Sequence, residues 1–336
     1  MNLHEITCPE CGSSNHFICS TYSTKCDGSR NLLKCKDCGE RFSETKNTFL
    51  FNLKTPVSKI AEVIKSRSEG MSFNSACRTF DIGTHTLQNW EKRFGNLKDT
   101  LMLYSLTHTF LHLVIEGDEL YTKINKNTEP HESEGWTVML MDRASRFIWE
   151  ASCGEKDESL FMSAIQTLRE VIEKTEDLTL VTDGEKRYSK LLFDICHELI
   201  KTGKPGRPRK VIKKGVKVRI KNKGDQSHKK GPKLTKYQAP KPEHPETTQD
   251  IVNSDIHANH LEGQNGATRR KISAYRRKTN TYAKSTNGLQ RVLDCYWVLH
   301  NFVRKHFTTK EVPAVKIGII DTPFDLRSIF EIQMAF

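Results

Sequence analysis

Apolar residues recur at two different spacings along the chain, and the change of spacing predicts where helices give way to strands. From residue 54 to residue 95 they recur every three or four positions, which is typical of short amphipathic helices. The first of three such helices places Ile60 and Ile64 on one face, and the third turns Leu87 and Trp90 inward. We therefore expect a small all-helical unit in this part of the chain.

The second of these helices is joined to the third by the tripeptide Asp81-Ile-Gly83. A helix, a three-residue turn with glycine and a second helix form the pattern of a helix-turn-helix, whose last helix reads the major groove of DNA. A plain helical linker is the alternative for patterns this short. Under the first interpretation, the outward side chains that suit base edges and phosphates are His85, Gln88, Asn89, Lys92 and Arg93.

Beyond a helical connector at residues 97–112, the apolar runs become short and rich in β-branched residues, which predicts strands. The predicted strands are residues 113–118, 136–142, 147–153 and 178–183, and the predicted helices are residues 158–173, 189–200, 255–278 and 289–302. Three strands, a helix and a strand that returns beside the first predict a mixed, five-stranded α/β sheet with helices. This is the element order expected of an RNase H-like fold.

Ten cysteines are present, and six of them lie within the first 38 residues. Two C-x-x-C pairs, Cys8 with Cys11 and Cys35 with Cys38, have the spacing that brings four thiolates to one tetrahedral zinc ion. Because this segment is too small and polar to hold a core without a metal, residues 1–48 are predicted to form a zinc ribbon with one structural Zn²⁺. The additional Cys19 and Cys26 are either structural or alternative ligands, and the ribbon would contact DNA or protein.

Positive charge is concentrated in one segment. Between residues 201 and 241 there are sixteen Lys or Arg and one acid, a net charge of +15, whereas the whole chain carries +12. A basic segment on a nearly neutral body indicates a polyanionic partner, most simply nucleic acid. A solvated loop without a specific partner is the alternative. Residues 201–254 are therefore predicted to be a low-complexity basic insert.

Two features of this insert add detail. The stretch Lys204-Pro-Gly-Arg-Pro-Arg-Lys210 contains the Gly-Arg-Pro core of an AT-hook, which would lay Arg207 into the minor groove of DNA beside Arg209 and Lys210. A generic basic loop is the alternative. Residues 211–220 alternate Val or Ile with Lys or Arg, which predicts a two-sided β-ribbon.

No apolar run is long enough to span a membrane, and the first residues lack the basic and apolar segments of a secretion signal. Charged residues make up 28% of the 336 positions and hydrophobic residues 36%. The length predicts two or three domains, and the missing span and secretion signal predict an intracellular, cytoplasmic protein without a membrane partner.

Two acidic residues share one local pattern. Asp183 ends a predicted strand and precedes Gly184, and Asp118 ends another and follows Gly117. A carboxylate beside a glycine at the end of a buried strand is presented at the sheet edge, where a ligand can approach closely. We expect both carboxylates to belong to a metal-binding acidic set. A turn or helix-cap role for Asp183 is the alternative.

Glu262 would be the third acid of this set. It lies in the first turns of the predicted helix 255–278, with Asn265 and Arg269 on the same helical face. Favourable charge at a helix start is the alternative explanation for this glutamate. The polar and basic residues of this region that would hold DNA are Asn265, Arg269, Arg270, Arg276 and Arg277.

Taken in order, these motifs resemble those of bacterial and archaeal DDE transposases related to insertion sequence one. The motifs that carry the resemblance are Gly117-Asp118-Glu-Leu, Trp136, Met141-Asp142-Arg143, Val181-Thr-Asp183-Gly, Glu262-Gly-Gln-Asn265, Thr268-Arg-Arg270, Arg277-Lys-Thr279, Tyr282-Ala-Lys-Ser285 and Val312-Pro-Ala-Val-Lys-Ile-Gly318. The resemblance spans nearly the whole chain. It implies a zinc ribbon at 1–48, a helix-turn-helix at 54–96, an RNase H-like catalytic domain at 110–310 with its basic insert at 201–254, and a C-terminal tail at 311–336.

The resemblance further implies that Asp118, Asp183 and Glu262 are the catalytic acids. Three carboxylates suit two Mg²⁺ or Mn²⁺ ions, which can clamp a phosphodiester for in-line displacement. The chain would then bind the terminal inverted repeats of a mobile element, cut their 3′ ends and join them to target DNA. It would act as a homodimer or larger assembly on DNA in the nucleoid of a prokaryote. Two other functions stay open: a non-catalytic DNA-binding regulator, and an RNase H-like nuclease for other nucleic acids.

Overall fold

The computed structural model describes residues 3, 5–25, 27–126, 129–201, 206–220, 257–277 and 280–334. Predictions for Cys26 and for most of the basic insert at 201–254 lie outside these residues. None of the helices in the described ranges is both long and apolar enough to cross a bilayer.

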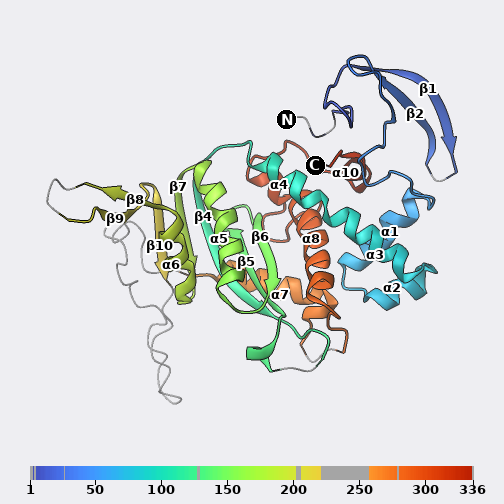
Figure 1. The fold of residues 1–336 in the computed structure, drawn as a ribbon. Helices are drawn as coiled ribbons and strands as arrows, with labels where there is room; N and C mark the ends of the chain where they lie inside the picture. Colours follow the sequence, from blue (N-terminus) through green and yellow to red (C-terminus); the bar gives the residue numbers. More distant parts are fainter. Residues whose placement is uncertain are drawn as a thin grey trace.

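The N-terminal unit is a small antiparallel sheet that projects from one end of the molecule (Figure 1). Its strands are β1 (His16–Thr24), β2 (Gly28–Cys35) and β3 (Arg41–Ser43). Its apolar core consists of little more than Leu33 and Phe42 around two of the cysteines. So small a core contributes little burial energy, and this favours a bound metal as the main source of stability here.

Helices follow where the sequence predicts them. Ser72 caps the second predicted helix by accepting a hydrogen bond from the Ser75 amide, and Asp81 ends that helix in the left-handed conformation at φ 48°. The helices are α1 (Val57–Ser68), α2 (Phe73–Phe80), α3 (Thr84–Gly95) and α4 (Leu97–Ser105). Their buried faces join the same hydrophobic core as the α/β unit. The DNA-binding role of this helical unit stays a prediction.

The predicted mixed five-stranded sheet is confirmed, with the strand order β10-β7-β4-β5-β6. Strands β4, β5 and β6 form an antiparallel meander, and β7 returns parallel to β4 as expected. The bounds are β4 (Phe110–Tyr121), β5 (Trp136–Asp142), β6 (Ile148–Gly154), β7 (Thr175–Thr182) and β10 (Val216–Ile220).

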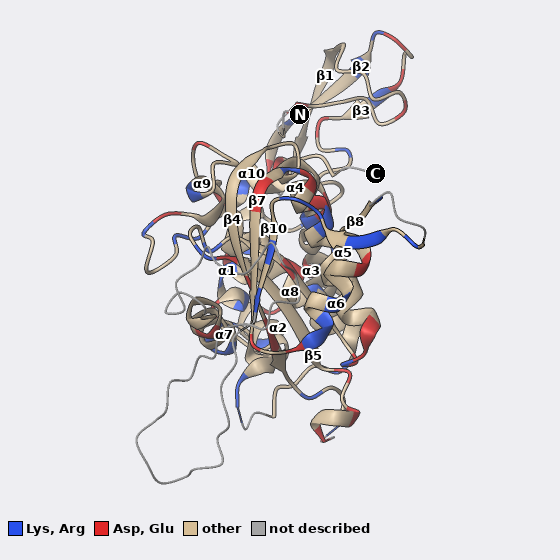
Figure 2. Cartoon of the chain, turned by 90° about the vertical axis from the view of Figure 1, so that its left-hand side faces the viewer, with Lys and Arg blue, Asp and Glu red and all other residues tan. Residues whose placement is uncertain are grey.

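Helices cover both faces of this sheet. The helices α5 and α6 pack together on one face, whereas α7 lies against β4 on the other and α8 packs on β6 (Figure 2). The bounds are α5 (Glu158–Glu173), α6 (Lys186–Ile195), α7 (Asn259–Lys271) and α8 (Thr286–Phe302). Within the described ranges, short 3₁₀ helices also span Pro130–Glu132 and Ser273–Tyr275. Since both faces are covered, β5 is buried from Thr137 to Asp142.

Four predicted elements are wrong in part. The helix expected at 255–278 ends at Lys271, and a short 3₁₀ turn at Ser273–Tyr275 follows it. The helix expected at 189–200 ends at Ile195, and β8 (His197–Ile200) pairs instead with β9 (Arg209–Ile212). The ribbon expected at 211–220 is divided, because Gly215 turns the chain at φ 84° and β10 joins the main sheet beside β7. The helical connector at 97–112 ends early, and β4 begins at Phe110.

The C-terminal segment is folded against the N-terminal half of the chain. It contains α9 (Pro313–Lys316) and α10 (Leu326–Glu331). The ring of Phe330 stacks on Phe49 with centroids 4.3 Å apart, and Gln333 accepts a hydrogen bond from the Thr7 amide. The described part of this segment, residues 311–334, therefore links the small sheet and the helical unit to the rest of the molecule.

Candidate functional site

Strand pairing places two of the predicted acids side by side. Gly117 of β4 lies opposite Thr182 of β7 in parallel register. Asp118 and Asp183 each follow directly, so the two residues are neighbours across the two strands. Asp183 lies just beyond the end of β7, whereas β4 does not end at Asp118 as predicted and continues to Tyr121. No substituent larger than hydrogen fits at Gly117 without crowding, since an added Cβ would lie 3.2 Å from Leu140 and 3.3 Å from Thr182. The glycine therefore permits the close strand packing that brings the acids together.

A third carboxylate, which the sequence analysis did not single out, completes this acidic cluster. Potential ligand oxygens of Asp118, Glu119 and Asp183 all lie within 4.8 Å of one another. Oxygens bound to one Mg²⁺ at about 2.1 Å can be at most ~4.2 Å apart. Small side-chain adjustments would thus let these three residues hold a divalent ion. In the sequence, Glu119 could have been identified as a site residue by its position directly after Asp118 in the Gly-Asp-Glu-Leu motif.

Electrostatics at the cluster favour a bound cation. Burial and the neighbouring charge of Asp183 raise the pKa of Asp118 to about 6. Burial also raises the pKa of Glu119, against the hydrogen bond from Lys156, whose Nζ lies 3.0 Å from the carboxylate. Carboxylates that crowd in a desolvated site repel one another, and a divalent ion relieves that repulsion. The donor set of carboxylate oxygens matches the hard-ligand preference of Mg²⁺ and Mn²⁺.

Helix α7 brings two further predicted residues to this edge of the sheet. Asn265 is buried and donates from Nδ2 to Asp118 Oδ2 at 2.7 Å. Glu262, one turn earlier, is exposed and lies outside the 4.8 Å cluster, although its charge contributes to the raised pKa of Asp118. The structure thus joins Asn265 directly to the acids, and the role of Glu262 as third catalytic acid stays a prediction.

A buried carboxylate that sequence reasoning missed fixes the start of α7. The residue is Glu116, which is fully buried two positions before Asp118. Its Oε2 accepts from the Leu261 amide at 2.8 Å, and its Oε1 accepts from Arg143 Nε at 2.7 Å and His260 Nδ1 at 2.9 Å. The helix has no side-chain cap of its own. Glu116 therefore satisfies an otherwise unpaired helix-start amide from the neighbouring strand.

The four predicted zinc ligands converge. Cys8, Cys11, Cys35 and Cys38 form a group of sulfur atoms within 4.8 Å, with Sγ–Sγ distances of 3.5 Å for Cys8–Cys38 and 3.6 Å for Cys11–Cys35. A tetrahedral zinc ion with Zn–S of about 2.3 Å requires sulfurs roughly 3.8 Å apart. A hydrogen bond from the Cys38 amide lowers the pKa of Cys35 to about 7, which favours the thiolate. These residues fit one structural Zn²⁺, and Cys19 lies outside the group.

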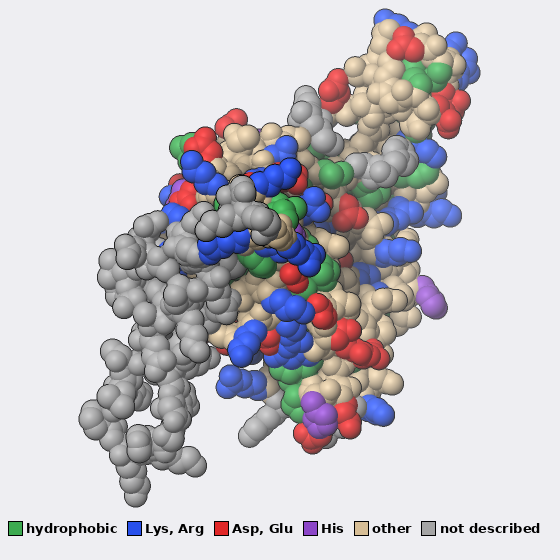
Figure 3. Space-filling model, turned by 60° about the vertical axis from the view of Figure 1, so that its left-hand side comes forward, with side chains coloured by type: hydrophobic (Ala, Val, Ile, Leu, Met, Phe, Trp, Pro, Cys, Tyr) green, Lys and Arg blue, Asp and Glu red, His purple; other side chains and the backbone are tan. Residues whose placement is uncertain are grey.

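The predicted DNA-contact residues occupy several surfaces. On α3, His85, Gln88, Asn89 and Lys92 are exposed, whereas Arg93 donates to the Phe51 carbonyl oxygen at 2.6 Å. Near β9, the exposed side chains are Arg207, Arg209 and Lys210. Figure 3 shows Lys and Arg side chains gathered on the side of the molecule that carries β8, β9 and β10. Arg270, Arg276 and Arg277 are exposed along and after α7, and Arg269 is half-buried.

Comparison with known proteins gives little beyond this geometry. No protein-family model matches the chain. No curated protein matches it. A chain in the crystal structure of the Mos1 strand transfer complex is similar at 10% identity over 39% of this chain and 52% of that chain, with a TM-score of 0.15. So low a TM-score carries no structural argument, and the conclusions below depend on the geometry of this chain.

Proposed function

We propose that the chain is a DDE-type DNA transposase with an RNase H-like catalytic domain. The observation that supports this most is the meeting of Asp118 and Glu119, within β4, with Asp183, which directly follows the end of the parallel strand β7. The mixed five-stranded sheet and the resemblance of the ordered motifs agree with it. Under this proposal the protein binds the inverted repeats of a mobile element, cuts their 3′ ends and joins them to target DNA.

Under this proposal, the residues of the site hold metal ions, orient a carboxylate or hold phosphates. Asp118 and Asp183, with Glu119 or Glu262, would hold one or two divalent ions, which supply Lewis-acid activation of water and charge stabilisation at the leaving oxygen. Asn265 orients the Asp118 carboxylate through its 2.7 Å hydrogen bond. Arg269 and Arg277, close to the cluster, would hold phosphates of the bound strand. Glu116 fixes the start of α7 and thus keeps Asn265 in place.

Other parts of the chain would hold DNA away from the cut. The exposed polar side chains of α3 suit a helix-turn-helix contact with element ends, and the basic side chains of β9 suit the phosphate backbone. Pairing of two element ends requires at least two copies of the chain, so we expect a dimer or larger assembly on DNA. A prokaryotic cytoplasmic location belongs to the same proposal.

The test uses a plasmid that carries the genomic DNA on both sides of this coding sequence. Purified wild-type protein should cut the repeat ends with Mg²⁺ or Mn²⁺ and not with EDTA, and Asp183→Asn should lose at least a hundredfold in cutting while still binding the ends. The matched control is Asp177→Asn at the opposite end of β7, where the carboxylate pairs with His112 and Lys217. Binding without metal-dependent cutting by the wild type would instead favour the non-catalytic regulator.

A further inference from the structure

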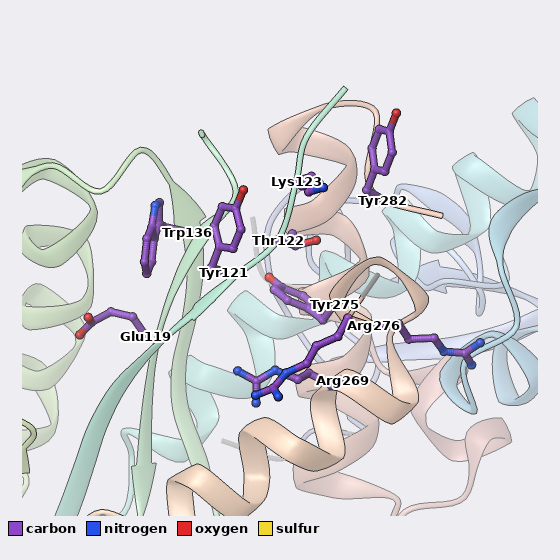
Figure 4. Close-up of a pocket in the computed structure, with 10 residues that line it drawn as sticks. Glu119, Tyr121, Thr122, Lys123, Trp136, Arg269, Tyr275, Arg276 and Tyr282 are labelled. Atoms are coloured by element: carbon purple, nitrogen blue, oxygen red, sulfur yellow. The ribbon is translucent and has the colours of Figure 1, made fainter. Parts of the chain in front are cut away.

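A cavity of about 360 Å³ opens next to the acidic cluster. Glu119 belongs to both, so any occupant of the cavity lies beside the proposed metal site. The other lining residues come from the end of β4, the start of β5, α7 and the segment after it (Figure 4): Tyr121, Thr122, Lys123, Trp136, Arg269, Tyr275, Arg276, Arg277 and Tyr282.

Aromatic rings supply much of the wall of this cavity. Tyr121 and Trp136 are a cross-strand pair with ring centroids 5.3 Å apart, and Tyr282 stands across from them (Figure 4). All three are only partly buried. The indole N–H of Trp136 donates to the Pro130 carbonyl oxygen at 2.7 Å, which fixes the orientation of the ring. Rings fixed in this way stack against planar ligands, and a base at Trp136 would share the ring with Lys156 Nζ, which lies 4.1 Å from its centroid.

Positive charge gathers in the same cavity. Arg269 and Arg277 have no salt bridge to any carboxylate within the described ranges, whereas Arg276 is directed to the Gly70 carbonyl oxygen at 2.9 Å. Burial and the nearby charge of Arg277 lower the pKa of Arg269. Two guanidinium groups close together in a half-buried site favour an anion between them, and their planar forks match the oxygens of a phosphate.

A ligand with a planar ring and a phosphate satisfies both sets of residues. In duplex DNA each base is stacked and paired, so its faces cannot reach the rings of a cavity. An acidic peptide would satisfy the arginines and leave the aromatic wall without a stacking partner. We propose that this cavity binds an unpaired nucleotide of a DNA strand, with the base on the Tyr121–Trp136 wall and the phosphate at Arg269 and Arg277. The inference deepens the proposed function, since it would place that nucleotide next to the scissile phosphate.

Tryptophan fluorescence can isolate this cavity from the other DNA-binding surfaces. Trp90, Trp149 and Trp297 are buried at 2%, 0% and 0% exposure, so Trp136 is the tryptophan that a bound base can reach. A short oligothymidylate, titrated without divalent metal, should quench the wild-type emission. An abasic oligonucleotide of the same length should quench it far less. Trp136→Phe should abolish the base-dependent quench and retain binding.

Affinity gives the second measurement. Tyr121→Ala should weaken binding of the oligothymidylate about 5- to 150-fold, the equivalent of ~1–3 kcal/mol for one stacked base, with little change for the abasic strand. Tyr121→Phe should restore the affinity. The control Phe307→Ala removes an aromatic ring that is 85% exposed and outside the cavity, and it should change neither affinity.

Each outcome decides the proposal. The proposal is wrong if Tyr121→Ala loses equal affinity for the normal and the abasic strand, or if the base-dependent quench persists in Trp136→Phe. Because this assay contains no divalent metal, it is independent of the cutting test. If the protein shows the base-dependent quench but does not cut DNA, the nucleotide site is supported and the transposase function is refuted. If the protein cuts DNA without a base-dependent quench, only the nucleotide site is refuted.

Discussion

Removal of the Glu116 carboxylate should destabilise the α/β unit. In Glu116→Ala, three donors lose their acceptor: Arg143 Nε, His260 Nδ1 and the Leu261 amide. The side chain of Glu116 is 0% exposed and that of Arg143 is 19% exposed, so water replaces little of the lost pairing. Breaking a buried ion pair from one side costs about 3–5 kcal/mol. Because Arg143 also donates to the His257 carbonyl oxygen, we expect the lower end, about 3 kcal/mol.

The conservative Glu116→Gln keeps one acceptor oxygen and loses the charge. Its expected cost is about 2 kcal/mol, in the range for a hydrogen bond to a charged group. Urea unfolding, followed by the fluorescence of the buried Trp149 and Trp297, reports on the affected unit. Hydrogen exchange of α7 should accelerate most in Glu116→Ala, where the Leu261 amide loses its acceptor.

The matched control for this series is Glu170→Ala, an exposed glutamate on α5. Surface substitutions of this kind change the free energy of unfolding by about 0.5 kcal/mol or less. If Glu116→Ala unfolds within about 1 kcal/mol of the wild type, the proposed anchoring of α7 by this carboxylate is wrong.

Two further predictions concern the zinc site and a buried histidine. Chelation of zinc, or Cys35→Ser, should unfold β1 to β3, visible as loss of hydrogen-exchange protection there, while the five-stranded sheet keeps its protection; retained protection in the small sheet would contradict this. Burial lowers the pKa of His300 to about 3. His300 of the unfolded chain therefore takes up a proton near pH 6.5, whereas His300 of the folded chain does not. The contribution of this residue to the free energy of unfolding is fully present above pH 6.5 and is lost as the pH falls towards 3. The loss should reach about 2 kcal/mol between pH 6.5 and 5, and urea titrations of His300→Gln should show a flatter pH dependence.

Periodicity and spacing in the sequence determined most local elements. The 3.6-residue repeat of apolar side chains predicted α5 at its observed bounds, and the apolar run at 136–142 predicted β5. The two C-x-x-C pairs predicted the sulfur cluster, because tetrahedral ligation leaves few other uses for that spacing. The element order also placed β7 beside β4, and with it Asp118 beside Asp183.

Tertiary structure decided which partner each element takes. The alternation of Val and Lys before Ile220 gives a two-faced strand, but any free strand edge can pair with it, and the parallel edge of β7 did so. The end of α6 at Ile195 was set by the pairing of β8 with β9, which local propensity does not encode.

In the candidate site, too, the sequence determined which side chains share a face, and tertiary packing decided which of them meet. The i+3 spacing placed Glu262 and Asn265 on one face of α7, yet only the packing of α7 on β4 brought Asn265 to Asp118 and left Glu262 exposed. Glu116 anchors the start of that helix through contacts 144 and 145 positions apart in sequence. Contacts of that separation depend on three-dimensional packing, and a one-dimensional pattern shows only which side chains share a face.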